Sequence, residues 1–220
     1  GMRDHANGEA IFVYPQGVQG VFNSWDRIDP ETGELNNPID SVAFLSALLE
    51  WSIDNLPVDP DKVFMMGFSN GAAMTQRMAA ERPDLLSAVA AVCNSVSVTE
   101  EDGSHYTLPT PVDGIPILVI RGGKDATVRP DGEPSQNKGR SHATPEEQLA
   151  FWREANGCGD TEPDTSTPVD GVTLQKYEPC TDNAVVWGIY AEDLEHDWPR
   201  PSNGGGFSGD QVIYDFLISR

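Results

Sequence analysis

A serine flanked by two glycines is the clearest chemical feature of the sequence. Ser69 lies in Gly67–Gly71 (Gly-Phe-Ser-Asn-Gly), after an apolar run from Val63 to Met66 and before a segment with helical spacing that extends to about residue 80. A strand that turns at once into a helix exposes such a serine in a strained turn, where the glycines avoid collisions with neighbouring backbone. The backbone amide of Asn70 would then face a developing oxyanion. The pattern predicts Ser69 as a nucleophile; the alternative is an inert serine in a glycine-flanked turn.

Two further side chains could activate this serine. Asp125 follows the apolar run Ile115–Ile120 and a Gly-Gly turn, and His196 follows the last apolar run, Ala184–Ala191. A serine hydroxyl needs an imidazole to take its proton, and the imidazole needs a carboxylate to fix its tautomer. Side chains at the carboxyl ends of parallel strands meet at one edge of a sheet. We therefore predict Ser69, Asp125 and His196 as a catalytic triad.

Each of these assignments has an alternative. Asp125 could be a simple turn residue, and Asp131, in a Pro-Asp-Gly turn, is a weaker rival for its role. His196 lies between two acidic residues and could be a solvated surface histidine. The other three histidines, at positions 5, 105 and 142, fall in the terminal tail and in polar loops, where a solvated role is favoured.

Strands and helices alternate along the chain, and this alternation predicts the fold class. The runs that indicate strands are 11–14, 63–66, 85–92, 115–120, 172–177 and 184–191, and helical spacing covers 39–55, 70–80, 145–156 and 210–218. Near-continuous apolar runs are typical of parallel strands that are buried on both faces. We expect one α/β domain over residues 1–220, with a mostly parallel central sheet flanked by helices. Polar loops are expected at 94–113 and 126–143.

The charge balance limits the possible partners. Lys and Arg total 14 against 35 Asp and Glu, which gives a formal net charge of −21. Phosphate groups would repel such a surface, so nucleic acid and anionic membranes are excluded as partners. The sequence has no run of about 18 apolar residues that could span a bilayer, and its first eight residues lack the apolar region of a signal peptide.

Several motifs of the chain resemble those of polyhydroxybutyrate depolymerases and feruloyl esterases, which are α/β hydrolases. The matching motifs are Gly-x-Ser-Asn-Gly-Ala-x-Met at Gly67–Met74, His-Asp-Trp-Pro at His196–Pro199, Val13–Gly17, Ile39–Phe44, Pro57–Asp59 and Phe151–Cys158. The resemblance covers nearly the whole chain. It implies an α/β-hydrolase fold and a carboxylic ester hydrolase with Ser69, Asp125 and His196 as its triad. We expect no cofactor.

The chain departs from those families at its N-terminus. They begin with further strands, one of which ends in a His-Gly loop that supplies half of the oxyanion hole. Here one strand, 11–14, is predicted before the strand 63–66, which leads into the turn at Ser69 that we call the elbow. We therefore expect a sheet that lacks the first strands. The chain is then a shortened form, or uses an amide near Gly17–Gly20 as the second donor, or is a degenerate enzyme. An unpaired sheet edge could also lead to a homodimer.

The sequence contains three cysteines. Cys158 and Cys180 have 21 residues between them, and a disulfide that closes such a loop contributes about 3 kcal/mol in the chain-entropy model. The resemblance supports this pairing, which implies a secreted or periplasmic protein; the alternative is two free thiols in a cytosolic one. Cys93 is expected to be a small buried apolar residue. No pair of Cys or His residues has zinc spacing, so no metal is expected.

Four of the five tryptophans are assigned to the predicted site or the predicted core. Trp25 and Trp198 are predicted to line the substrate pocket, although Trp198 could instead anchor the loop of His196. Trp51 and Trp152 lie on predicted helices and are expected in the core.

The function we expect is a serine carboxylic ester hydrolase that acts on small or polymeric esters. The alternatives are a serine peptidase of the oligopeptidase type and a degenerate hydrolase-fold protein that binds a ligand or partner. A fluorophosphonate probe would separate the last of these, because it labels only an activated serine.

Overall fold

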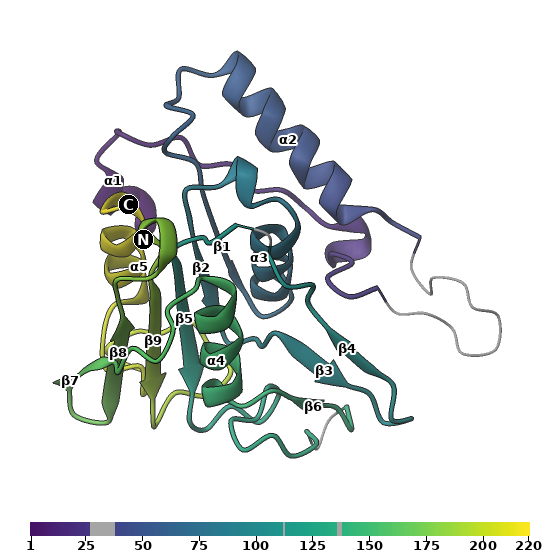
Figure 1. Cartoon of the computed structure of the whole chain (residues 1–220), viewed down its shortest axis with the longest axis vertical. Helices are drawn as coiled ribbons and strands as arrows, with labels where there is room; N and C mark the ends of the chain where they lie inside the picture. The colour runs from purple at the N-terminus through teal and green to yellow at the C-terminus, as the bar shows by residue number, and fades with distance from the viewer. Residues whose placement is uncertain (27–37, 112, 136–137) are drawn as a thin grey trace.

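A mostly parallel sheet forms the centre of the protein (Figure 1). The computed structural model describes residues 1–26, 38–111, 113–135 and 138–220. Within this part, six strands follow the order β1-β2-β5-β9-β8-β7. The first four are parallel, and β8 and β7 complete the sheet as antiparallel neighbours. Their bounds are Phe64–Phe68 (β1), Ala88–Val92 (β2), Ile117–Gly122 (β5), Asp164–Val169 (β7), Val172–Tyr177 (β8) and Val186–Ala191 (β9).

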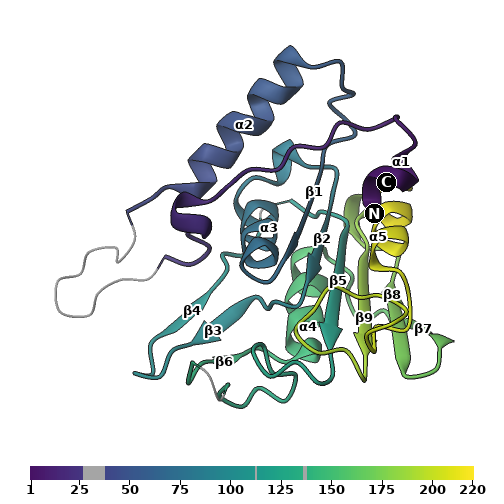
Figure 2. The ribbon, with the colours of Figure 1, turned by 180° about the vertical axis from the view of Figure 1, so that it is seen from behind.

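Helices cover both faces of this sheet (Figures 1 and 2). Helices α3 (Asn70–Glu81) and α4 (Pro145–Ala155) pack on one face, with Val89 and Ile117 in the shared core cluster. Helix α5 (Gly209–Ile218), with α1 (Met2–Ala6) beside it, packs on the other face against Ala90 and Leu118. Alternate residues of one strand therefore enter different clusters. Burial on both faces explains why these strands are continuous apolar runs, and the predicted α/β architecture is confirmed.

Helix starts follow local capping signals. At α4, the Thr144 hydroxyl accepts a hydrogen bond from the Glu147 amide, and the Glu147 carboxylate accepts one from the Thr144 amide. This reciprocal pair, with Pro145 at the first helical position, matches the predicted start. Helix α2 (Ser41–Asn55) begins where the Asp40 side chain accepts a bond from the Ala43 amide, two residues later than predicted.

The predicted strand at 11–14 does not form. Ile11, Val13 and Tyr14 lie 49%, 48% and 67% exposed and belong to no strand. A strand needs a neighbour for its backbone hydrogen bonds, and β1 is the edge of the sheet, with no strand on its outer side among the described residues. An apolar run alone therefore does not make a strand, and the prediction of a strand at 11–14 is wrong.

Short polar strands were missed because they lack an apolar signal. β3 (Ser97–Thr99), β4 (His105–Thr107) and β6 (Ser141–His142) form a second small sheet within segments predicted as loops. β7 was missed as well, because all of its residues are exposed and it contains Pro168. The remaining elements are the 3₁₀ turns η1 (Val18–Gly20), η2 (Pro83–Leu85) and η3 (Thr181–Asn183).

The two helical tryptophans have different environments. Trp152 on α4 is fully buried, and its indole N–H donates to Gln76 Oε1 at 3.1 Å, so its predicted place in the core is confirmed. Trp51 is 56% exposed, and the same prediction for it is wrong. Helix α2 lies outside α3 and buries one stripe that includes Leu45, so Trp51 falls on its outward side.

The predicted disulfide is present. Cys158 follows α4, and its bond to Cys180 joins the end of that helix to the connection between β8 and β9, with a Cα–Cα distance of 4.1 Å. Cys93 is free and buried, as expected. Among the described helices, none combines the length and apolar character needed to cross a membrane.

Candidate active site

Ser69 occupies a strained turn between β1 and α3. Its φ of 52° and ψ of −119° lie in a region that side-chain-bearing residues rarely adopt. A Cβ on Gly67 would lie 2.2 Å from the carbonyl carbon of Gly71, so the turn requires a glycine at position 67. A Cβ on Gly71 would meet nothing within 4 Å, so the expected steric need for a second glycine is wrong.

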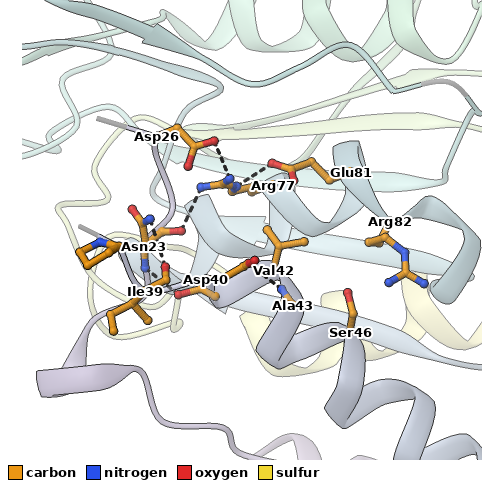
Figure 3. Close-up of a pocket in the computed structure, with 12 residues that line it drawn as sticks. Asn23, Asp26, Ile39, Asp40, Val42, Ala43, Ser46, Arg77, Glu81 and Arg82 are labelled. Carbon is orange, nitrogen blue, oxygen red and sulfur yellow. Dashed lines mark hydrogen bonds and ion pairs between the residues drawn. The ribbon is translucent and has the colours of Figure 1, made fainter. Parts of the chain in front are cut away.

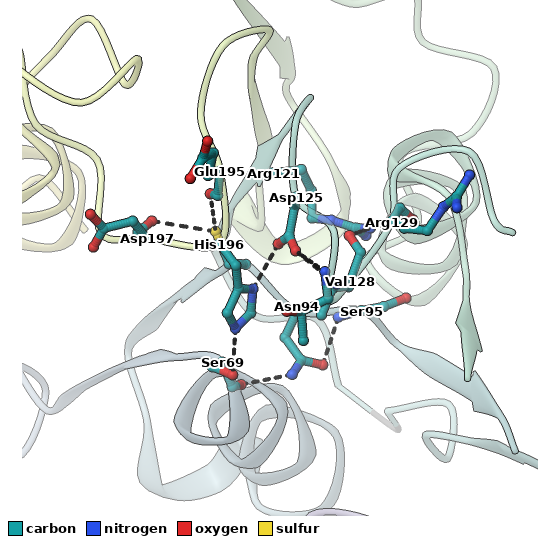
Figure 4. Close-up of polar contacts among 12 residues, drawn as sticks. Ser69, Asn94, Ser95, Arg121, Asp125, Val128, Arg129, Glu195, His196 and Asp197 are labelled. Atoms are coloured by element: carbon teal, nitrogen blue, oxygen red, sulfur yellow. Dashed lines mark hydrogen bonds and ion pairs between the residues drawn. The ribbon is translucent and has the colours of Figure 1, made fainter. Parts of the chain in front are cut away.

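The structure brings Ser69, His196 and Asp125 into one hydrogen-bonded chain (Figure 4). His196 Nε2 lies 2.9 Å from Ser69 Oγ, and His196 Nδ1 lies 2.8 Å from Asp125 Oδ2. A carboxylate can only accept, so Nδ1 carries the proton and Nε2 is left to accept the serine O–H. The His196 side chain is 21% exposed, while that of Asp125 is fully buried. Solvent therefore reaches this hydrogen-bonded row of side chains from the serine side and not from the aspartate side.

Asp125 is held by its own loop. Its Oδ1 accepts the backbone N–H groups of Thr127 and Val128, each at 2.8 Å, which leaves Oδ2 for the imidazole. The rival Asp131 instead forms an exposed ion pair with Arg129. These contacts distinguish the two aspartates, which the sequence alone did not.

The Gly-Gly turn before Asp125 admits the loop that carries His196. A Cβ on Gly122 would lie 2.3 Å from the carbonyl oxygen of Leu194, and one on Gly123 would lie 2.4 Å from that of Glu192. The two loops pack backbone to backbone at the ends of neighbouring strands β5 and β9. On its other side, the His196 ring contacts Phe68, with ring centroids 5.0 Å apart.

Arg121 is a buried positioning element that sequence reasoning missed. It is 1% exposed and donates to Gln148 Oε1 at 2.9 Å and to the carbonyl groups of Ala143, Val128 and Arg129 at 3.1–3.4 Å. Burial lowers the pKa of Arg121 to about 10, so it remains a cation at neutral pH. It fastens the loop after Asp125 to the start of α4. The signal available in the sequence was a charged residue placed directly after the apolar run 115–120.

Asn70 joins the elbow to residues 22–24. Its side chain accepts from the Phe22 amide at 2.8 Å and donates to the Phe22 carbonyl and to Ser24 Oγ, both at 3.1 Å. Its backbone N–H begins α3 and has no partner within that helix. Asn94 supports the turn from β2, because its amide donates to the Ser69 carbonyl at 2.7 Å. Neither side-chain role was predicted.

The backbone N–H groups of residues 20–23, which lie near the elbow, already donate hydrogen bonds to other groups. The N–H of Asn23 donates to Ser41 Oγ at 2.9 Å, and those of Gly20 and Val21 donate to carbonyl groups of the η1 turn. With the Phe22 amide bonded to Asn70, four amides of this segment are in use. A second oxyanion donor is therefore not one of these four.

The two tryptophans predicted to line a substrate pocket differ in burial. Trp25 is 7% exposed and belongs to the core cluster that includes Leu45, which favours a packing role over substrate binding. Trp198 is partly buried, and its backbone is bonded to Asp197 Oδ1 and to Asn203 Nδ2. These bonds fix the loop after His196 and leave the substrate role of Trp198 a prediction.

A cysteine completes a group of three potential metal-ligand side chains. Ligand-type atoms of Cys93, Asp125 and His196 lie within 4.8 Å of one another. Burial and the neighbouring Asp125 raise the pKa of the Cys93 thiol to about 12. A thiolate, not a thiol, is the strong metal ligand, and the other two groups are bonded to each other. The donor set therefore fits a hydrogen-bonded cluster better than a metal centre.

The other histidines lie outside this chain of bonds. The ring of His5 lies beside that of Tyr214 at a tilt of 32°, and His105 Nδ1 lies 2.9 Å from Thr99 Oγ1. His142, expected in a solvated loop, is instead on β6 with a buried, unpartnered Nδ1. Burial, and then the positive charge of Arg121, lower the pKa of His142 to about 4.

The burial of His142 predicts an acid-sensitive fold. Its folded pKa of about 4 lies below the unfolded value of 6.5, so its contribution is complete above pH 6.5 and is lost as the pH falls towards 4. This loss is at most about 3 kcal/mol. Urea unfolding across this pH range should show a steeper fall for wild type than for His142→Gln, because glutamine does not titrate. Equal slopes would contradict the prediction.

A cavity of about 440 Å³ lies beside α3 (Figure 3). Arg77 enters it with both of its acidic neighbours, Asp26 at 2.8 Å and Glu81 at 2.6 Å, so its charge is already paired. The lining residues are Asn23, Asp26, Pro38, Ile39, Asp40, Ser41, Val42, Ala43, Ser46, Arg77, Glu81 and Arg82. None of Ser69, Asp125 and His196 is among them.

Known proteins similar to this chain are esterases. No family model matches the chain. Acetylxylan esterase of Coprinopsis cinerea is 41% identical over 89 residues, which are 40% of this chain and 24% of that protein. Feruloyl esterase B of Piromyces equi is 27% identical over 178 residues, 79% of this chain and 31% of that protein. The chain thus spans less than a third of the length of either relative.

A solved structure supports the fold. The acetyl xylan esterase from Aspergillus awamori superposes with a TM-score of 0.55 at 18% identity, covering 80% of this chain and 67% of that one. With the parallel sheet and the strand–turn–helix at Ser69, this likeness confirms the expected fold. The chain has the α/β-hydrolase fold, and its sequence is similar to those of acetylxylan and feruloyl esterases.

Proposed function

We propose that this protein is a serine hydrolase that cleaves carboxylic esters through an acyl-enzyme on Ser69. The observation that supports this most directly is the placement of His196 between Ser69 Oγ at 2.9 Å and Asp125 Oδ2 at 2.8 Å. These are the contacts that general-base activation of a serine requires. The solvated role considered for His196 would not need a buried carboxylate on Nδ1.

The proposed reaction has two halves. His196 Nε2 takes the Ser69 proton as Oγ attacks the ester carbonyl, and Asp125 stabilises the imidazolium that forms. The imidazolium then protonates the leaving alcohol, and the acyl group remains on Ser69. A water molecule, deprotonated by His196, attacks the acyl-enzyme, and the returning proton restores the Ser69 hydroxyl as the acid is released.

The Asn70 backbone N–H is the proposed oxyanion donor. It lies at the first position of α3, where the helix end also favours negative charge. The backbone amides of Phe22 and Asn23 donate to Asn70 Oδ1 and Ser41 Oγ, so they are not available as a second donor. The Asn70 N–H is thus the one oxyanion donor that we assign. An oxyanion hole with one donor instead of two turns over about 100 to 1,000 times more slowly, so, from the donors defined among the described residues, we propose a slow esterase.

The similar proteins support an ester rather than an amide substrate. Their names describe esterases of acetylated xylan and of feruloyl groups, and we propose substrates of this kind, either small or polymeric. The disulfide between Cys158 and Cys180 supports a secreted or periplasmic setting. Besides the water molecule of the second half, the proposed reaction uses side chains and a backbone amide of the chain. The homodimer stays a prediction.

A substrate panel tests the function. The protein should hydrolyse p-nitrophenyl acetate, and acetylated xylan or methyl ferulate, but not peptide anilides. A fluorophosphonate probe should label Ser69 in the same preparation. Cleavage of the anilides alone would favour the peptidase alternative. A folded protein that is neither labelled nor active would favour the ligand-binding alternative and contradict the proposal.

A further inference from the structure

Cys93 lies directly behind the His196 loop. It follows the last residue of β2, the strand between the elbow strand and the strand that leads to Asp125. Its Sγ lies 3.5 Å from the carbonyl oxygen of Asp197 and 3.9 Å from that of Glu195. Figure 4 draws both contacts as dashed lines that meet at the sulfur. The thiol therefore contacts the backbone both before and after the imidazole.

The backbone of Cys93 is held in an unusual conformation that directs this contact. Its φ is 54°, in the left-handed region, and its N–H donates to the Ile120 carbonyl at 2.9 Å. The residue is fully buried. A residue with a side chain is strained in this region. Surrounding contacts must therefore favour it: the N–H bond to Ile120, packing in the core cluster on the α5 face, and the side-chain contacts with the His196 loop.

We propose that Cys93 is a positioning residue for His196. Its single S–H donates to the Asp197 carbonyl at 3.5 Å, with the Glu195 carbonyl at 3.9 Å beside it, and so keeps the imidazole between Ser69 and Asp125. This goes beyond a packing role, because a packing residue needs no donor. The inference rests on the proposed function only for its kinetic consequence; the geometric consequence can be measured without any substrate.

The protonation state of Cys93 suits this role. Its raised pKa, about 12, keeps the sulfur protonated at neutral pH, so it can donate and adds no second negative charge beside Asp125. The thiol is a weak donor, but it is buried against the Asp197 carbonyl, and leaving an acceptor without a partner in a buried site is costly. The loop also has its own bond, from the Asp197 amide to the Glu195 carbonyl at 2.8 Å.

Two substitutions separate donation from packing. Cys93→Ala removes the donor, and Cys93→Ser keeps a donor, as an O–H group, in a side chain of the same shape. Misplacing a catalytic group by about 1 Å can cost as much as 100-fold in rate. We expect Cys93→Ala to lower kcat about tenfold with KM nearly unchanged, and Cys93→Ser to recover most of that loss. Val89→Ala, a buried change near the start of the same strand, is the control for lost packing.

Proton NMR provides a readout that is independent of activity. The low-field resonance of the His196 Nδ1 proton should shift or broaden in Cys93→Ala and remain in Cys93→Ser and Val89→Ala. Wild-type kcat and an unchanged resonance in Cys93→Ala would overturn the proposal, as would a Cys93→Ser variant as impaired as Cys93→Ala. If wild type itself hydrolyses no ester, the proposed function fails, and the resonance alone still decides the role of Cys93.

Discussion

Replacing Ser69 with alanine is expected to lower ester turnover by about 10⁴-fold or more and to abolish fluorophosphonate labelling. In the proposed mechanism the serine Oγ is the only protein atom that bonds to the acyl group. Thermal stability should change little, because Ser69 has no side-chain cap bond to α3 and its Oγ contacts His196 at the open end of the site. Initial rates with p-nitrophenyl acetate and a thermal melt measure both quantities.

Ser87→Ala is a suitable control for this variant. Ser87 lies just before β2, at the opposite end of the parallel strands, where its hydroxyl donates to the Asp61 carbonyl. It should keep wild-type turnover. Substantial turnover by Ser69→Ala would contradict the assignment of the nucleophile, whatever the behaviour of the control.

Replacing Gly67 with alanine is expected to destabilise the protein by about 3 kcal/mol or more. The new Cβ would lie 2.2 Å from backbone atoms of Gly71 and 2.6 Å from the Ala72 amide nitrogen. Backbone cannot move aside as a flexible side chain can, so the turn between β1 and α3 must open. The urea midpoint of unfolding should fall, and the little folded protein that remains should be inactive because Ser69 is displaced.

Gly71→Ala is the matched comparison. Its Cβ would meet nothing within 4 Å, and the residue lies inside α3, where alanine is the better helix former. We expect the free energy of unfolding to change by less than about 1 kcal/mol. Two glycines four residues apart in one motif should therefore differ sharply. A Gly67→Ala variant as stable as Gly71→Ala would show that a small backbone shift relieves the clash at position 67.

What the sequence could predict depended on how local each signal was. The strand, the turn and the helix around Ser69 are contiguous, so the elbow was read directly from one segment. Asp125 and Asp131 are six positions apart in one loop, and both follow the same strand. Only the hydrogen bonds of Thr127, Val128 and His196 to Asp125 distinguish them.

Roles that depend on distant contacts were not predictable. Cys93 was correctly expected to be buried, but its contacts with Glu195 and Asp197 cross more than 100 positions in sequence. Arg121 likewise serves a loop and a helix that follow it. The failed strand at 11–14 has the same cause, because strand formation depends on a neighbour that the local pattern cannot report.

The order of the strands has a consequence for how the site is made. Ser69, Cys93, Asp125 and His196 follow β1, β2, β5 and β9, which are successive neighbours in the sheet. Ser69 and His196 are 127 positions apart, so their contact closes a long loop and forms only when all four strands are in register. Regain of hydrolysis during refolding should thus lag behind helix formation and coincide with completion of the sheet, because no shorter stretch of the chain contains the whole set.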